Sequence, residues 1–327
     1  MPATWIVLVD FNGLGDTRKC LQSLAVSTMA ANVVVVDNAS KVEVGPALQA
    51  EFPSVVFVRS PVNGGWAGGN NIGVKYAMER GADLMILLNN DTTVPPEFTA
   101  KMIAAAEAHS NYGVLGPVIH FMDEPTKVQT TGVVFNRPDR PGFFQPIDVS
   151  TTPGSPAVVA ADIVNGCCLM IRRATVEKIG LIDERYFLIH EESDWSLRVQ
   201  EAGGVCGVIA EGLVWHKGSS SFQREGKALQ RYFDARNLLR LLLRHRRRAT
   251  ARKPIPALVH YLKYIFHRYA HEKDGGFEKS ARAVLEGLYD GLRRRSGPYP
   301  SGWRPGLFAL RGIASLAWRL RRSKSPV

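Results

Sequence analysis

The sequence predicts an α/β protein with a mostly parallel central sheet flanked by helices, followed by a basic helical extension. Through the first hundred residues, short apolar runs alternate with helical segments, which is typical of βαβ units and a parallel sheet. The charge then changes sign along the chain. Residues 1–216 carry 15 Lys and Arg against 23 Asp and Glu, a net charge of −8, whereas residues 217–327 carry 26 against 7, a net charge of +19. We therefore expect a first domain at 1–226 and a helical extension at 227–327.

The strands expected in the first hundred residues each run into polar residues. These strands are Trp5–Val9, Val33–Val36, Val55–Val58 and Leu84–Leu88, and the helices between them are Asp16–Ser27, Val44–Glu51 and Val74–Arg80. Asp16 is the expected N-cap of its helix, because its carboxylate can accept a backbone N–H. Ligands bind at the carboxyl ends of parallel strands. We therefore expect the strand-end carboxylates Asp10, Asp37 and Asp91 to meet at one edge of the sheet.

The rest of the first domain alternates less regularly. Residues 122–160 are rich in Pro, Gly, Asp and Thr and indicate a loop or a small antiparallel insertion around Val133–Phe135. The other elements expected are a helix at Pro95–His109, strands at Val114–Phe121 and Val164–Arg173, a helix at Ala174–Ile179, a helical stretch at Tyr186–Ala202, and edge strands at Val205–Ile209 and Leu213–Trp215.

The strand end Leu84–Thr93 is the first candidate for chemistry. Asp91 follows two asparagines, and a carboxylate beside carboxamides at this edge can hold a divalent cation through oxygen ligands. The alternative is a plain polar turn, in which Asn and Asp are common. His216 follows another expected strand and is a candidate ligand, although a single histidine more often has a structural role.

The segment Asn63–Gly73 has four glycines within six residues. We expect a binding loop that runs into the following helix, with glycines that let the backbone approach a ligand and asparagines that form hydrogen bonds with it. A flexible turn is the alternative. The first strand lacks Gly-x-Gly-x-x-Gly and the chain has no Walker lysine motif, so the sequence does not favour a dinucleotide fold or a P-loop.

An acidic cluster, Glu191, Glu192 and Asp194, lies within the stretch Tyr186–Ala202. At a helix N-terminus the helix dipole stabilises such carboxylates. One of them, facing a cleft with a raised pKa, could act as a general base. The alternative is a capping cluster on a surface helix.

The basic extension has helices expected at Lys227–Arg248, Ala257–His271, Glu278–Arg295 and Gly306–Arg322. In the last, an apolar stripe lies beside four arginines: Leu310, Ile313, Ala314, Ala317 and Leu320 beside Arg311, Arg319, Arg321 and Arg322. Such a helix can lie on an anionic membrane surface; packing on the core with a solvated charged face is the alternative.

Without a zinc finger or an RNA-binding aromatic motif, no nucleic-acid partner is expected. The four cysteines form no Cys-x-x-Cys pair, no signal peptide or membrane span is apparent, and we expect a cytoplasmic protein on the inner face of the membrane.

Taken together, these segments resemble family two inverting glycosyltransferases of the GT-A fold, in particular the rhamnosyltransferase-like branch. The resemblance covers residues 4–240. It depends on the following motifs in order: Asp10-Phe11-Asn12, Asp37-Asn38-Ala39-Ser40, Asn63–Gly73, Asn89-Asn90-Asp91, Asn165-Gly166 through Arg173, Glu191-Glu192-Ser193-Asp194-Trp195, His216, and Tyr232 through Arg236-Asn237. Three of these depart from the family pattern, which has Asp-x-Asp at the metal motif, Asp at the position of Glu192, and more often Ser or Thr at the position of Asp10.

The resemblance implies transfer of a sugar from a dTDP- or UDP-sugar donor, with dTDP-rhamnose a candidate, to a saccharide or polyprenyl-diphosphate-linked acceptor for cell-surface polysaccharide. Asp91, with His216 as second ligand, would hold Mg²⁺ or Mn²⁺ on the donor diphosphate. Glu192 would be the catalytic base, with Glu191 or Asp194 as alternatives. The residues expected to line the donor site are Asp10, Asn12, Asp37, Asn38, Asn63, Gly64, Gly65, Asn70, Asn71, Asn90, Gly166 and Arg236.

Two other functions fit parts of the sequence. A catalytically inactive scaffold protein that binds nucleotide sugars at the membrane would explain the altered metal motif. A sugar-phosphate nucleotidyltransferase has a related sheet, but it should carry a Gly- and Lys-rich loop near residue 12, which this chain lacks.

Overall fold

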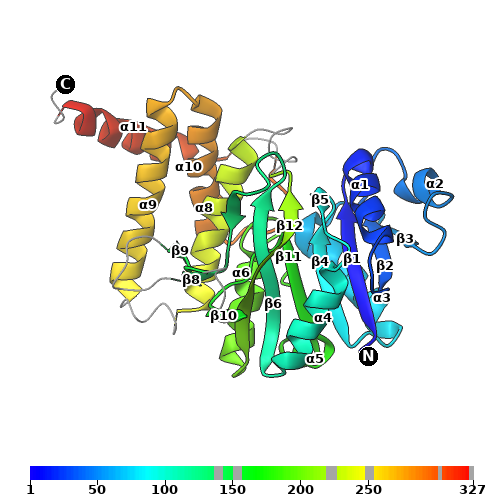
Figure 1. Ribbon diagram of the computed structural model, residues 1–327. Coiled ribbons are helices and arrows are strands. Elements are labelled where there is room, and N and C mark those ends of the chain that lie inside the picture. Colours follow the sequence, from blue (N-terminus) through cyan, green and yellow to red (C-terminus); the bar gives the residue numbers. More distant parts are fainter. Residues whose placement is uncertain (136–142, 150–156, 219–226, 247–253, 301–303, 324–327) are drawn as a thin grey trace. The chain divides into compact units, whose positions relative to one another are not determined.

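The computed structural model describes residues 1–135, 143–149, 157–218, 227–246, 254–300 and 304–323 (Figure 1). The chain forms two compact units. Unit 1 comprises Met1–Arg137, Phe143–Phe187 and Glu191–Gly218, and unit 2 comprises Pro138–Gly142, Leu188–His190 and Ser219–Val327. The acidic part of the sequence thus coincides closely with unit 1, and most of the basic part belongs to unit 2.

Unit 1 is an α/β unit, as predicted. Its elements are β1 (Thr4–Asp10), α1 (Leu14–Ala25), β2 (Asn32–Asp37), α2 (Val44–Leu48), β3 (Val56–Arg59), α3 (Gly65–Glu79), β4 (Leu84–Asn89), β5 (Thr92–Thr93), α4 (Phe98–Ala108), β6 (Tyr112–Phe121), β7 (Val128–Thr130), β8 (Val133–Phe135), β9 (Phe144–Pro146), β10 (Val158–Ala161), β11 (Cys168–Arg172), α5 (Arg173–Ile179), α6 (Glu191–Glu201) and β12 (Val205–His216).

The central sheet has the strand order β10-β12-β6-β11-β4-β1-β2-β3, with β5 added beside β12 and β7 beside β6. Strands β4, β1, β2 and β3 are parallel, and β6 and β12 form a second parallel pair. Strand β11 is antiparallel to both of its neighbours and joins the two parallel blocks. The small antiparallel insertion expected within 122–160 is present as the β8–β9 pair.

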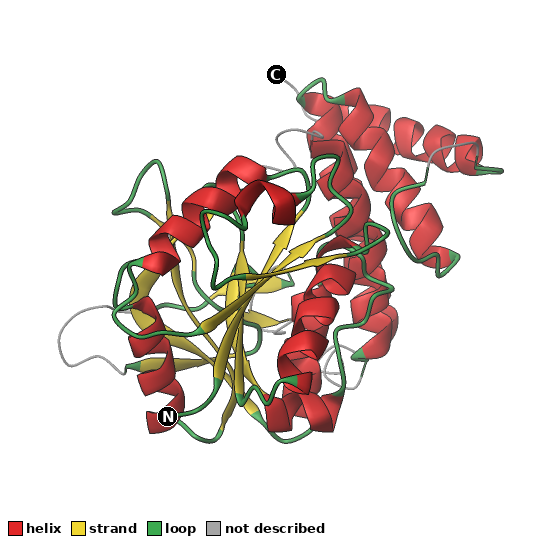
Figure 2. Cartoon of the chain, turned by 90° about the vertical axis from the view of Figure 1, so that its right-hand side faces the viewer, coloured by secondary structure: helices red, strands yellow, loops and turns green. Residues whose placement is uncertain are grey.

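Helices cover both faces of this sheet, as Figure 2 shows. Side chains alternate along β1, so that Ile6 and Leu8 face a core formed with α1, α2 and α4. Trp5 and Val7 face the opposite core, formed with α3, α5 and α6. The central strands are buried on both faces, which explains why they are apolar without interruption.

Helix α1 begins earlier than predicted, and Asp16 is not its N-cap. The N-cap residue is Gly13, and no side chain caps the helix. The backbone N–H of Gly13 instead donates to Asp10 Oδ1 at 3.2 Å, so the strand-end carboxylate fixes the turn into the helix. Asp16 lies in the first turn, where its carboxylate contacts Lys217 Nζ at 3.0 Å.

The segment Asn63–Gly73 is mostly helix, so the predicted binding loop is wrong as secondary structure. Helix α3 starts at Gly65, and its glycines allow it to pack closely on β1. A Cβ atom on Gly69 would lie 2.6 Å from Val9 Cγ1, and one on Gly73 would lie 2.2 Å from Val7 Cγ1. The helix therefore needs residues without side chains at these positions, although glycine lowers its intrinsic helix propensity.

The two edge strands predicted at Val205–Ile209 and Leu213–Trp215 are one long strand inside the sheet. Strand β12 lies between β10 and β6, with register shifts near Gly212. Sequence pattern does not give strand order, because order depends on contacts between distant segments. The last residues of β12 pair with β5, with Trp215 opposite Thr93 and His216 opposite Thr92.

Unit 2 is helical, as predicted for the basic extension, and contains α8 (Lys227–Arg244), α9 (Pro254–Asp274), α10 (Glu278–Leu292) and α11 (Leu307–Ser323). Helices α8 and α10 pack closely, since a Cβ atom on Gly287 would lie 2.3 Å from the carbonyl oxygen of Tyr232. Buried acids in α10 are paired, with Tyr232 Oη donating to Asp290 Oδ2 at 2.8 Å. No helix in the described part of the chain is both long enough and apolar enough to cross a membrane.

Candidate active site

The carboxyl ends of β1, β2 and β4 come together at one edge of the sheet, as the sequence predicts. Asp10 at the end of β1 is the register partner of Asp37 at the end of β2. On the other side of β1, Val9 pairs with Asn89 at the end of β4, two residues before Asp91. All three aspartates are buried, with 0%, 1% and 9% of Asp10, Asp37 and Asp91 exposed.

Asp10 organises the loops at this edge. Its carboxylate accepts hydrogen bonds from Thr17 Oγ1 at 2.5 Å, Ser40 Oγ at 2.8 Å and Asn90 Nδ2 at 3.2 Å. These bonds tie the ends of β1, β2 and β4 to each other and to α1. Asp10 and Asn90 were predicted to line the donor site, and the structure shows them bonded to each other and to the loops at this edge of the sheet. Asn12 lies in the same turn, and its Oδ1 accepts the backbone N–H of Lys41 at 2.8 Å.

Asp37 has a cationic partner that the sequence analysis missed. Arg59 at the end of β3 contacts the Asp37 carboxylate through Nη1, and its side chain is 40% exposed. Asp37 also accepts backbone N–H groups from Ser40 at 2.8 Å and Val44 at 3.2 Å. Strand register could have identified Arg59, because Asp37 and Arg59 are direct partners in the β2–β3 pair.

The asparagines next to the glycines bond mainly within the protein. Asn38 Nδ2 donates to Asn63 Oδ1 at 3.1 Å and to the Gly65 carbonyl at 2.9 Å, and its Oδ1 accepts the Gly64 N–H at 2.9 Å. This closes the turn before α3. Further along the helix, two other predicted donor residues are buried and also bonded internally: Asn70 Nδ2 to the Trp66 carbonyl at 2.9 Å, and Asn71 Nδ2 to Ile182 and Glu184 at 2.9 Å.

Asp91 and His216 meet, as the sequence predicts for the two candidate metal ligands. The β5–β12 pairing brings them together, and His216 Nε2 lies 3.1 Å from Asp91 Oδ1. His216 Nδ1 contacts Gln129 Oε1 at 2.7 Å, which orients the imidazole ring. Burial lowers the pKa of His216, but contacts with Cys167 and with the Asp91 carboxylate outweigh it and raise the pKa to about 10.

This pair of side chains fits a divalent cation. A carboxylate oxygen and a neutral imidazole nitrogen both bind such ions, so a bound cation would have to displace the proton that the raised pKa of His216 implies. Adjacent ligands in an octahedral shell lie about 3 Å apart when the bonds are about 2.1 Å long. Within the described ranges, no cluster of three or more His, Cys, Asp or Glu side chains could hold a metal by itself. The remaining ligands would therefore come from a bound phosphate group and water.

The three carboxylates at the start of α6 have different surroundings. Asp194 is fully buried, and its oxygens contact Arg198 Nε at 2.9 Å and Tyr186 Oη at 3.3 Å. Glu191 is 4% exposed. Glu192 is only partly buried, and its Oε1 accepts the Ser193 hydroxyl at 3.0 Å. Among the three predicted candidates for the base, Glu192 is thus the carboxylate open to solvent.

Glu192 lies beside Gly166 and Trp66. A Cβ atom on Gly166 would be 3.2 Å from Glu192 Cγ and 3.4 Å from Trp66 Cζ2, so the Glu192 side chain would have to shift slightly to admit one. The Trp66 indole donates from Nε1 to Asn89 Oδ1 at 3.0 Å. Trp66 therefore connects the surroundings of Glu192 to the end of β4, close to Asp91. The sequence analysis did not single out Trp66, although it lies within the glycine-rich motif.

Arg236, predicted to meet a donor phosphate, belongs to unit 2 and is fully buried. Its Nε donates to Asn237 Oδ1 at 2.8 Å and its Nη1 donates to the Gly297 carbonyl at 2.7 Å. The Arg236 guanidinium has no exposed surface and bonds within the protein, so it is not part of the site described here.

Sequence comparison gives a family match over the region that contains most of this site. The model of the family described as "Glycosyl transferase family 2" matches residues 5–180. The dTDP-rhamnosyl transferase RfbF of Shigella flexneri is 26% identical over 247 residues, covering 73% of this chain and 79% of that protein. The N-acetylglucosaminyl-diphospho-decaprenol L-rhamnosyltransferase of Mycobacterium tuberculosis is 24% identical over 238 residues, covering 67% and 78%.

Solved structures with the same fold include two with bound Mn²⁺. The mannosyltransferase PcManGT from Pyrobaculum calidifontis, in complex with GDP-Man and Mn²⁺, aligns with a TM-score of 0.53 at 15% identity over 98% of this chain and 83% of its own. GalNAc-T7 with UDP, GalNAc and Mn²⁺ aligns with a TM-score of 0.56 at 16% identity, and this chain spans about half, 51%, of that structure. These likenesses show the GT-A fold.

Proposed function

The chain belongs to glycosyl transferase family 2, and from this we propose that it transfers a sugar from a nucleotide-sugar donor to a saccharide or lipid-linked acceptor with inversion at the anomeric carbon. The observation that carries the proposal is the distribution of carboxylates at one sheet edge. Asp91 with His216 fits a cation, and Glu192 is a separate, partly exposed carboxylate beside Trp66. The altered metal motif leaves the inactive scaffold protein as the alternative.

Each side chain has a distinct task in this mechanism. Asp91 and His216 would hold the Mg²⁺ or Mn²⁺ ion, which neutralises charge that develops on the leaving diphosphate. Glu192 accepts the proton of the acceptor hydroxyl, so that the hydroxyl oxygen can attack the anomeric carbon. The Glu192 carboxylate need not be a strong base, because the hydroxyl loses its proton as the new glycosidic bond forms. Trp66 and Glu192 both border Gly166, and we place the acceptor next to them.

Two observations support the proposed class of donor. Asp37, with Arg59 against it, lies at the sheet edge where the family resemblance implies contact with the pyrimidine base of the donor. Two relatives are named as rhamnosyltransferases, one of them as a dTDP-rhamnosyl transferase. We therefore place dTDP-rhamnose first among the donors to test, and a polyprenyl-diphosphate-linked saccharide first among the acceptors.

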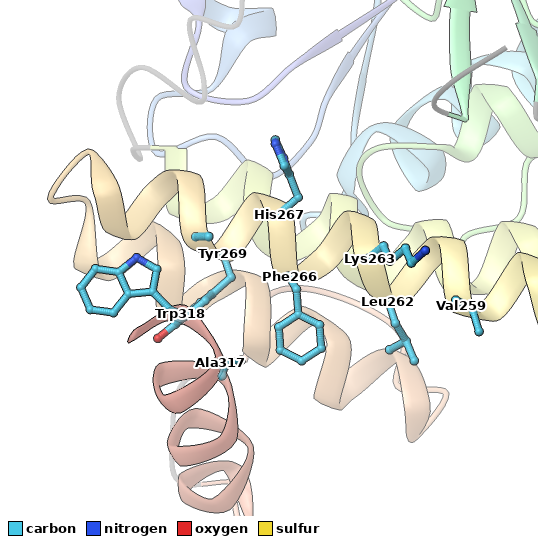
Figure 3. A pocket seen from close by; sticks show the side chains of 10 residues that line it. Val259, Leu262, Lys263, Phe266, His267, Tyr269, Ala317 and Trp318 are labelled. Carbon is cyan, nitrogen blue, oxygen red and sulfur yellow. The ribbon is translucent and has the colours of Figure 1, made fainter. Parts of the chain in front are cut away.

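We further propose that unit 2 docks on an anionic membrane surface. Helices α9 and α11 border an apolar groove of about 400 Å³, in which Val259, Leu262 and Phe266 point to the same side of α9 (Figure 3). Next to it α11 exposes apolar side chains, with 77% of Phe308, 62% of Ile313 and 60% of Leu316 accessible. The surplus of Lys and Arg in this part of the sequence complements anionic lipid headgroups. Of the predicted apolar stripe, Ala314 is buried, and the side chains of Leu320, Arg321 and Arg322 lie outside the described residues.

The base assignment gives the central test. Glu192→Gln keeps the size of the side chain but removes its basicity, so transfer should fall by about 10²–10⁴-fold while the donor and Mn²⁺ still bind. The measurements are turnover with dTDP-rhamnose and a lipid-linked acceptor, and donor binding by calorimetry. Glu201→Gln, an exposed change at the far end of the same helix, is the matched control.

Two outcomes would contradict this assignment. Full activity of the Glu192→Gln protein would remove Glu192 from the mechanism. A loss of donor binding in this protein would instead place Glu192 at the donor or metal. Tight donor binding by the unaltered protein, without turnover of any acceptor in the panel, would favour the inactive scaffold.

A further inference from the structure

The chain enters α6 through a strained turn. Phe187, Ile189 and His190 have φ angles of 66°, 69° and 74°, which place three non-glycine residues within four positions in the left-handed region. This conformation is sterically unfavourable for a residue with a Cβ atom, and it persists only where neighbouring groups impose it. Helix α6 starts at the next residue, Glu191, and Glu192 follows in its first turn.

Side chains of α8 impose this conformation, and the contacts lie within unit 2, which includes Leu188–His190. Asn237 Nδ2 donates to the Leu188 carbonyl at 2.7 Å and to the Ile189 carbonyl at 2.8 Å. One turn earlier on the same helix, Asp234 Oδ1 lies 3.1 Å from His190 Nε2. Three consecutive residues before α6 are therefore bonded to two side chains of one helix.

These two side chains are themselves held in place. Tyr264 Oη on α9 donates to Asp234 Oδ2 at 2.6 Å, and Arg268 Nη2 donates to Tyr264 Oη at 3.0 Å. Burial raises the pKa of Asp234, but hydrogen bonds from His190 and Tyr264 outweigh it and lower the pKa below its ordinary value. Asn237 is fully buried, and its Oδ1 accepts Arg236 Nε. The network is therefore rigid on the side of α8 and α9.

We propose that Asn237 and the His190–Asp234 pair are positioning residues for Glu192: they fix the strained turn that sets the start of α6, and thereby the direction of the Glu192 carboxylate. The inference rests on the proposed role of Glu192. None of the three residues touches the reacting groups in this scheme. Loss of the network should therefore lower turnover and leave donor binding intact, because Asp91, His216 and Asp37 belong to unit 1 and keep their contacts.

His190 offers the sharpest test, because its backbone and side-chain roles can be separated. Asparagine tolerates positive φ, so His190→Asn keeps the turn accessible, but its side chain is too short to reach Asp234. His190→Gln has the reach and an amide donor. We expect kcat to fall about tenfold or more in His190→Asn and to recover most of this loss in His190→Gln, with donor KM within about twofold in both. Equal loss in both proteins, or a loss confined to donor KM, would overturn the proposal.

A matched control separates positioning from general destabilisation. Tyr232→Phe removes a buried hydrogen bond from the same helix, to Asp290, but does not touch Leu188–His190. This protein should show a lowered Tm with unchanged kcat. If Tyr232→Phe lowers kcat as much as His190→Asn at a similar Tm, the network has no specific effect on catalysis and the proposal is wrong.

A double mutant distinguishes this inference from the role of Glu192. If His190 acts through Glu192, then His190→Asn should cost nothing further in a Glu192→Gln background, because the group it positions is gone. Multiplied losses in the double mutant would refute positioning while leaving Glu192 as the base. Full activity of Glu192→Gln alone would refute the proposed function itself.

Discussion

Single atoms decide much of the packing around this site. Gly69 and Gly73 let α3 lie against β1. Gly65 has a φ of 69°, and a Cβ atom on it would lie 2.2 Å from the Phe187 carbonyl oxygen. Gly166 has no side chain next to Glu192. At each position the missing side chain is what allows two elements to approach. Gly65, Gly69 and Gly73 thus have steric roles, which the sequence could not distinguish from ligand binding.

Gly73→Ala should destabilise unit 1 by about 1–3 kcal/mol, because the new methyl group overlaps Val7 and the core has to shift. The free energy of unfolding in urea is the measurement. Gly15→Ala in α1 meets no atom within 4 Å and should be neutral or slightly stabilising. Equal stability of the two proteins would show that the α3–β1 contact is looser than described.

Asp91→Asn should weaken donor binding that depends on Mn²⁺, by about tenfold or more, because a neutral amide replaces the charged ligand. Donor binding without the metal should change little. Titration calorimetry with and without Mn²⁺, and after treatment with a chelator, measures both quantities. Glu107→Gln, an exposed acid on α4, is the control. A donor affinity of Asp91→Asn that is unchanged in Mn²⁺ would exclude Asp91 as a metal ligand.

At the scale of elements, the strands and helices that could be predicted are those that a local sequence pattern determines. Strands β1, β2 and β4 are uninterrupted apolar runs, and the helices of unit 2 follow an amphipathic period, so both were predictable. Helix α3 was not, because its propensity is low and its stability comes from packing on β1. The place of β12 in the sheet, the Asp37–Arg59 contact and the Trp66–Asn89 bond depend on pairing between distant segments. The meeting of Asp91 and His216 was predictable only from the family resemblance.

Helices α8 and α9 also carry a titratable group with a defined effect on stability. The pKa of Asp234 is lowered, so its ionised form stabilises the folded state at pH values above its unfolded pKa, near 3.8, and this contribution is lost as pH falls through the folded pKa. His190, Tyr264 and Arg268 are the groups that face it. Unfolding measured from about pH 5 down to about pH 2 should show a shallower acid loss for Asp234→Asn. An unchanged acid slope would contradict the lowered pKa.

At the scale of the whole molecule, charge and chemistry are separated along the chain. The acidic unit 1 holds the sheet edge with Asp91, whereas the basic surplus and the exposed apolar residues of α11 belong to unit 2. This division suits the proposed function, in which unit 1 would bind a small anionic donor and unit 2 would bind an anionic membrane surface. Recognition by unit 2 would then depend on salt, and recognition by unit 1 on the cation.

The full chain should bind vesicles that contain anionic lipid, and added salt should weaken this binding. Replacing Phe308, Ile313 and Leu316 by Ser should reduce binding strongly, since these side chains are exposed and supply the apolar contact. Leu292→Ser, at an equally exposed leucine on α10, is the control. Sedimentation with vesicles of defined composition measures both. Binding that survives the triple replacement would exclude α11 as the docking helix.

The two-residue strand β5 has a consequence for folding. Asp91 and His216 are far apart in the sequence and become neighbours only when the end of β12 pairs with β5. Such a non-local contact forms after much of the loop-closure entropy has been lost, so a partly folded chain has no cation site. A divalent ion would bind only the completed sheet and would shift the equilibrium away from partly folded forms. The shortest strand of the sheet would therefore make a bound cation a selective ligand of the native state.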